Sequence, residues 1–253
     1  MENIIKLDKF HTKIPPSKYV CHEEEQKSND LIGLYMKFDD NDNLSINMSG
    51  KPFATPNDLG AITLDNYTQI PDIIYNSTGI EIDKDYLLNQ AQILTAHVKT
   101  DISLDGHLPD YISLIREIFK RNTDKFDVYR YSDLTYENGL QIIPKTDNKD
   151  FTGLAVVPKN KDNYRFIIYL KKAELDKYDN KEYKKIFDYN FLEKVSHMIR
   201  FEYQMRKFED MRNAFGIYNL TLSNILHSTE NPVFKFFMTL LNDSEKEVNY
   251  ENI

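Results

Sequence analysis

Hydrophobic and polar residues alternate along several short stretches of the chain, and this alternation predicts β-strands. Residues 31–38 and 44–48 are the clearest pair, and we expect them to form a hairpin across the polar turn "DDNDN". Residues 93–105 and 197–205 alternate over a longer distance and predict two extended strands. Further strands are expected at residues 126–131, 140–143, 153–157 and 164–169.

Apolar residues spaced three or four positions apart predict helices between these strands. The segment "PDYISLIREIFKR" begins with Pro109 and carries Ile112, Ile115 and Phe119 on one face, which is typical of an amphipathic helix. Other helices are expected at residues 70–76, 84–92 and 171–187 and over the last fifty residues. This order of elements predicts an α+β fold with a mostly antiparallel central sheet, flanking helices and a helical C-terminal segment.

The same pattern suggests three parts of the chain. Residues 1–30 are polar and irregular, and we expect them to form an N-terminal arm. Residues 31–220 are expected to form the main domain, and residues 221–253 a helical segment after it. Because 41% of the residues are hydrophobic, the main domain can bury a sizeable core.

Composition narrows the class of protein. The single cysteine, Cys21, excludes an intramolecular disulfide and a cysteine-based zinc cluster. No apolar run approaches the roughly 18–20 residues that a membrane span requires. The first residues, "MENIIKLDKF", lack the layout of a signal peptide. We therefore expect a soluble cytoplasmic protein that does not associate with a membrane.

Charge is unevenly distributed. The net charge is −8, which disfavours a protein that coats nucleic acid. Residues 156–215, however, contain 14 Lys and Arg against 10 Asp and Glu, a local net charge of +4. Contact with nucleic acid at one site is compatible with this distribution, and so is scattered solvated charge.

Two of the expected strands carry polar side chains on one face, because successive side chains of a strand point to opposite sides. The polar face of the first strand contains Lys99, Asp101, Ser103 and Asp105, and that of the second contains Arg200, Glu202 and Gln204. A sheet with one solvated face explains both patterns without a function. If the strands instead bring Asp101, Asp105 and Glu202 together, these carboxylates are suited to a hard divalent cation, Mg²⁺ or Mn²⁺.

The stretch "YRFIIYLKKAEL" raises a question about its second tyrosine. Tyr169 shares a strand face with Arg165 and is followed directly by Leu170, Lys171 and Lys172. A phenol has a pKa of about 10 and is a poor nucleophile near neutral pH, but nearby cations favour its phenolate form. Tyr169 is thus either a nucleophile beside positive charge or one of many core aromatic residues.

Three blocks of the sequence resemble phage and plasmid replication proteins of the gene II/X type. The run from "LSINMSGKPFATPNDLG" to "HVKTDISLD" resembles the N-terminal half of that family. "RFIIYLKKAEL" is similar to its "IYDKxxEL", and "HMIRFEYQMRKFEDMRNAFGI" is similar to its "LRFEIQLKR…LGI". The blocks occur in the family's order and span roughly residues 31–220, so the resemblance implies a rolling-circle initiator nuclease fold.

The resemblance also implies a function. Such initiators nick one strand of origin DNA with a tyrosine and a divalent metal, and they keep a 5′-phosphotyrosine link. Carried over to this chain, the nucleophile is Tyr169, assisted by Lys171, and Asp101 and Glu202 lie in the matching strands. Together with Asp105, which the strand alternation adds, they are the expected ligands of Mg²⁺ or Mn²⁺. The residues expected to bind DNA are Arg165, Lys172, Arg200, Arg206 and Lys207. The implied partners are single-stranded or supercoiled origin DNA and a helicase or polymerase of the bacterial host of a phage or plasmid.

Two departures from the family pattern keep an alternative open. Leu170 stands where the family usually has Asp, and the chain lacks the His-x-His metal motif of many rolling-circle nucleases. A catalytically inactive relative that binds DNA or a replication partner is compatible with both departures. An accessory protein unrelated to nucleic acid is a third possibility, which only the composition favours.

Overall fold

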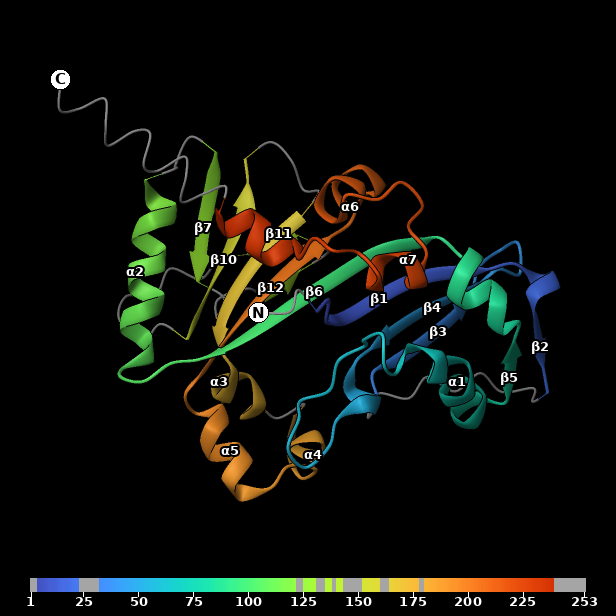
Figure 1. Ribbon diagram of the computed structural model, residues 1–253, viewed down its shortest axis with the longest axis horizontal. Helices are drawn as coiled ribbons and strands as arrows, with labels where there is room; N and C mark the ends of the chain where they lie inside the picture. Colours follow the sequence, from blue (N-terminus) through green and yellow to red (C-terminus); the bar gives the residue numbers. More distant parts are fainter. Residues whose placement is uncertain are drawn as a thin grey trace. The chain divides into compact units, whose positions relative to one another are not determined.

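The computed structural model of the protein describes residues 4–22, 32–121, 125–130, 135–137, 140–142, 152–159, 164–177 and 180–238. It is an α+β structure with a large antiparallel sheet of eight strands, in the order β3-β4-β1-β6-β12-β11-β10-β7 (Figure 1). The chain divides into two compact units. The first unit comprises Met1–Lys99 and Met205–Pro232, and the second comprises Thr100–Gln204 and Val233–Ile253.

The first unit contains the strands β1 (Leu7–Ile14), β2 (Tyr19–Cys21), β3 (Leu34–Phe38), β4 (Leu44–Ser49), β5 (Ile80–Ile82) and most of β6 (Ile93–Ser103). Its helices are α1 (Ile70–Thr78), the π-helical turn η4 (Tyr86–Gln90), α6 (Phe208–Phe215) and α7 (Leu222–Leu226). Three short 3-10 turns complete it: η1 (Pro16–Lys18), η2 (Lys51–Phe53) and η3 (Tyr67–Gln69).

Alternation determines which face of this unit's strands is buried. In β4 the buried residues are Leu44, Ile46 and Met48, and the residues between them are partly exposed. Helix α1 has Pro71 in its first turn and ends at Gly79, which has the left-handed conformation (φ 69°) that a helix C-terminus favours. Local sequence signals therefore agree with the structure in this part of the chain.

The second unit contains β7 (Phe126–Arg130), β8 (Thr135–Glu137), β9 (Leu140–Ile142), β10 (Gly153–Pro158), β11 (Tyr164–Leu170) and nearly all of β12 (Met198–Met205). Its helices are α2 (Leu108–Lys120), α3 (Lys171–Leu175), α4 (Lys181–Lys184) and α5 (Tyr189–Val195), and residues 233–238 are also helical.

An aromatic core covers one face of the sheet in the second unit. Phe166 of β11 stacks on Phe236 with ring centroids 4.8 Å apart, and Phe119 of α2 lies 6.4 Å from each of these two rings. From β12, Phe201 and Tyr203 join the same cluster. Because neighbouring side chains of a strand alternate, the opposite face of β11 and β12 carries the polar residues.

Most expected elements are confirmed. The hairpin is β3 with β4, the first long strand is β6, the amphipathic helix is α2, and the second long strand is β12. The expectation of an irregular polar arm at residues 1–30 is wrong over β1. This strand pairs with β4 and β6, and its Leu7, Phe10 and Ile14 are fully buried.

Each of the two compact units combines two separate stretches of the chain, and the expected division at residues 31, 220 and 221 stays a prediction. Sequence analysis also missed α5, which precedes β12, and the short strand β8. Among the described residues, no helix is long and apolar enough to cross a membrane.

Candidate functional site

The candidate site is the polar face of the sheet in the second unit. β11 and β12 are neighbours in the strand order, and β6 lies on the other side of β12. Sequence alternation predicted that Arg165 and Tyr169 share one face of β11 and that Arg200 and Glu202 share one face of β12. All four side chains are buried in the structure. This face is therefore a buried polar layer, whereas the sequence alone also allowed a solvated one.

Tyr169 and Glu202 meet on this face. The Tyr169 hydroxyl donates to Oε2 of Glu202 across 3.3 Å, and the two residues are only 4% and 5% exposed. The other carboxylate oxygen, Oε1, accepts a hydrogen bond of 2.8 Å from Nε2 of Gln204. Glu202 is thus positioned between a phenol and an amide.

Lys171 supplies positive charge beside the same phenol. It is the first residue of α3, which begins directly after β11. Its ammonium lies 5.6 Å from the centroid of the Tyr169 ring, and the residue is 6% exposed. A cation within about 6 Å of an aromatic face is attracted to the ring, and it also favours negative charge on the phenol oxygen.

Asp101 and Arg200 form a bidentate ion pair between β6 and β12. Nε of Arg200 donates to Oδ1 of Asp101 at 2.6 Å, and Nη2 donates to Oδ2 at 2.7 Å. The Arg200 side chain is 3% exposed and that of Asp101 is 23% exposed. Two parallel bonds to one carboxylate fix both side chains, and they occupy both oxygens of Asp101 with donors.

The three carboxylates expected to bind a metal do not gather around one point. Asp101 is bound to Arg200, Glu202 is bound to Tyr169 and Gln204, and Asp105 is an exposed residue beyond the end of β6. Within the described ranges, no group of three His, Cys, Asp or Glu residues has the geometry to hold a metal ion. The arrangement of Asp101, Asp105 and Glu202 therefore does not fit the expected Mg²⁺ or Mn²⁺ site.

The basic residues expected to bind DNA fall into two groups. Lys172, Arg206 and Lys207 are exposed on the surface. Arg165 and Arg200 are 8% and 2% exposed, so in this structure they serve the interior of the sheet rather than its surface.

Gln204 was not expected to take part in the site, although sequence alternation put it on the same face as Glu202. Its hydrogen bond to Glu202 became visible only with the tertiary structure. A long polar residue two positions from an expected metal ligand is a signal that alternation can supply.

Comparisons with known proteins give no family for this chain. No protein-family model matches it, and neither a curated protein nor a solved structure is similar enough to match.

Proposed function

We propose that the protein is a replication initiator that nicks one strand of origin DNA, with Tyr169 as the nucleophile. The observation that carries this proposal is the contact of the Tyr169 hydroxyl with the Glu202 carboxylate at 3.3 Å, with the Lys171 ammonium 5.6 Å from the ring centroid. A nucleophile with a proton acceptor at its hydroxyl and a cation beside its ring is an arrangement that can activate a hydroxyl group. The resemblance to gene II/X-type proteins adds the substrate class.

In the proposed reaction the Tyr169 oxygen attacks the phosphorus of one phosphodiester, and the phenolic proton passes to the Glu202 carboxylate. The bond from phosphorus to the 3′-oxygen breaks, and that oxygen takes a proton from solvent water to become a 3′-hydroxyl. The 5′-phosphate stays on the tyrosine as a phosphodiester, so the step is reversible. Lys171 stabilises the phenolate before the attack and the charge on the phosphate during it.

A divalent metal belongs to this proposal only through the resemblance. When bound, Mg²⁺ or Mn²⁺ would supply a Lewis acid for the phosphate oxygens. Because the described carboxylates do not fit such a site, no step above depends on the metal.

Burial of the nucleophile favours a second candidate function. Tyr169 is 4% exposed, so a DNA phosphate reaches its hydroxyl only after neighbouring side chains move. Asp101 and Arg200 are moreover committed to each other. These two observations favour an inactive relative that binds DNA, or a host helicase or polymerase, through its surface.

A nicking assay distinguishes the two candidates. The protein is incubated with single-stranded DNA from its own replicon's origin, with Mn²⁺, with Mg²⁺ or with EDTA, and the products are separated on a denaturing gel. The proposal expects a protein-linked DNA band that Tyr169→Phe abolishes and that Tyr164→Phe, on the opposite face of β11, leaves unchanged. An adduct that survives Tyr169→Phe would contradict the assignment of the nucleophile. DNA binding without any adduct would favour the inactive relative.

A further inference from the structure

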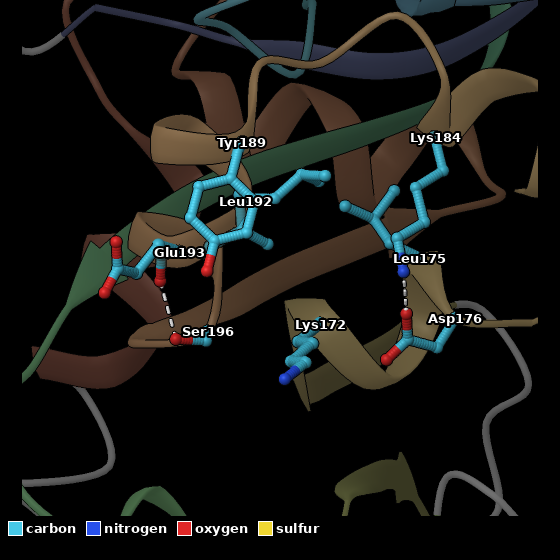
Figure 2. Close-up of a pocket in the computed structure, with 9 residues that line it drawn as sticks. Lys172, Leu175, Asp176, Lys184, Tyr189, Leu192, Glu193 and Ser196 are labelled. Atoms are coloured by element: carbon cyan, nitrogen blue, oxygen red, sulfur yellow. Dashed lines mark hydrogen bonds and ion pairs between the residues drawn. The ribbon is translucent and has the colours of Figure 1, made fainter.

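A cleft in the second unit lies between helices α3 and α5, with the end of α4 at its side (Figure 2). Its volume is about 290 Å³, at the small end of the range for pockets that bind small molecules. A volume of this size suits one ring system rather than a helical peptide. None of the side chains that the nicking proposal requires lines this cleft.

The cleft is lined by apolar side chains and by one aromatic ring that is exposed to solvent. Leu175 of α3 and Val195 of α5 are 2% and 1% exposed, and Leu192 adds to the apolar wall. Tyr189, at the start of α5, is 80% exposed although it lines the same cleft. A wide exposed ring beside an apolar wall can accept a flat aromatic group by stacking.

The charges around the cleft leave one cation available. Lys184 is paired with Asp176, so these two charges compensate each other. The Lys172 ammonium makes no hydrogen bond or ion pair with any other residue that the structure describes. Glu193 is the remaining anion. Figure 2 shows its carboxylate turned away from Lys172, while its main-chain carbonyl accepts a bond of 2.6 Å from the Ser196 hydroxyl.

We propose that this cleft binds one unpaired nucleotide of single-stranded DNA. The base stacks on the Tyr189 ring against the apolar wall, and Lys172 binds a phosphate of the same strand. Stacking on an aromatic side chain accepts any base, which suits a strand that passes through a site rather than a sequence-specific contact.

This inference rests on the proposed function, because it assumes a DNA ligand. It adds to that function the position of the DNA strand on the protein. Lys172 is three residues after Tyr169, so their Cα atoms are at most about 11 Å apart. A strand whose phosphate contacts Lys172 therefore passes the end of β11, within a few nucleotides of Tyr169. The cleft is thus a positioning subsite for the strand that is nicked.

Binding of a fluorescein-labelled oligothymidylate, followed by anisotropy, tests the inference. The measurements use protein that also carries Tyr169→Phe, so that binding is separated from covalent reaction. Tyr189→Ala is expected to weaken binding by roughly 5- to 100-fold through lost stacking. Lys172→Gln is expected to weaken it roughly two- to fivefold, and Glu193→Gln to strengthen it by a similar factor.

Matched controls exist for both residue types. Tyr218 is 79% exposed in the first unit, and Lys181 is an exposed lysine of α4 that does not line the cleft. Tyr218→Ala and Lys181→Gln are expected to leave the affinity unchanged. If the cleft variants and these controls lost the same affinity for the oligothymidylate, the inference would be overturned and the nicking proposal would be unaffected.

Tyr189→Trp gives a direct readout of contact, since the chain contains no tryptophan. Its fluorescence is expected to be quenched by the oligothymidylate, and that of Tyr218→Trp is expected not to change. If thymidine monophosphate quenched this fluorescence and the oligonucleotide did not, the inference would be overturned, and the cleft would instead be a site for a free nucleotide. If the fluorescence of Tyr189→Trp were quenched by the oligonucleotide but the protein formed no covalent adduct with DNA, the cleft would still be a nucleotide-binding site, and the nicking proposal would be rejected.

Discussion

The Tyr169 hydroxyl donates to Oε2 of Glu202 across 3.3 Å, and both side chains are almost completely buried. Tyr169 ends the apolar run of β11, and Glu202 lies in the middle of β12, 33 residues later. Two buried polar groups are compatible with a stable fold only if their hydrogen-bonding capacity is satisfied, here in part by each other. The same contact is what makes a phenol with a neighbouring proton acceptor available for chemistry.

Removing this hydroxyl is expected to weaken the fold as well as any nicking activity. Tyr169→Phe leaves Oε2 of Glu202 without this donor, and we expect the free energy of unfolding to fall by about 1–3 kcal/mol. Urea denaturation followed by circular dichroism measures the change. Tyr189→Phe, which alters an 80% exposed residue, is the control and should change the value by less than about 0.5 kcal/mol. Equal stability of the two variants would contradict the hydrogen bond.

The Asp101–Arg200 pair predicts a stability effect that does not depend on metal. Asp101→Ala leaves the Arg200 guanidinium, whose side chain is 3% exposed, without its carboxylate partner. Breaking a buried ion pair from one side costs about 3–5 kcal/mol, and thermal or urea unfolding in EDTA should show a loss of that order. The exposed Asp105 provides the matched control, and Asp105→Ala should have little effect. If Asp101→Ala changed stability only when Mg²⁺ or Mn²⁺ was present, Asp101 would act as a metal ligand instead.

Asp39 predicts a pH dependence in the first unit. A hydrogen bond from Lys13, together with the backbone amides of Asn41 and Asn43, lowers the pKa of the Asp39 carboxyl from 3.8 to about 2. Because the pKa is lower in the folded state, the interaction contributes stability above about pH 4 and loses it as the pH falls through about 2.

NMR titration of the Asp39 side chain checks this value. Lys13→Gln removes the largest cause of the shift, so the midpoint should move up toward 3.8, although the two amides still hold it below that value. A midpoint that is the same in both proteins would show that Lys13 does not bind Asp39 in solution.

Gly60 is expected to tolerate no side chain. It has a φ of +69°, and a Cβ there would lie 2.5 Å from the carbonyl oxygen of Gly50 and 2.7 Å from the amide nitrogen of Ala54. Its own carbonyl accepts a hydrogen bond from the buried Lys99 ammonium, so the loop cannot shift freely to make room.

We expect Gly60→Ala to lower the free energy of unfolding by more than the roughly 1 kcal/mol that a left-handed conformation alone costs alanine. Gly106→Ala is the comparison, because Gly106 also has a positive φ but its Cβ would meet no atom closer than 3.7 Å. Thermal denaturation of the two variants separates crowding from backbone strain. If Gly60→Ala lost less unfolding free energy than Gly106→Ala, the expected steric crowding at residue 60 would be contradicted.

Local patterns predicted much of this fold. The amphipathic spacing of residues 109–121 corresponds to α2, with Ile112 and Phe119 fully buried, and the alternation of residues 44–48 corresponds to β4. The pattern failed at β1, where Leu7, Phe10 and Ile14 are separated by polar residues. Thr12 is also buried there, and its hydroxyl donates a hydrogen bond to the main-chain carbonyl of Gln92. A buried polar residue that a distant backbone group satisfies gives no signal in the sequence.

The sequence by itself determined which residues share a strand face, because alternation is a property of the extended backbone. It thereby grouped Tyr169 with Arg165 and Glu202 with Arg200. Only the tertiary structure decided which of these side chains pair across strands and whether they meet water. Asp101 pairs with Arg200, a residue 99 positions away in the chain, and local alternation cannot predict such a contact because it depends on which strands are neighbours and in what register.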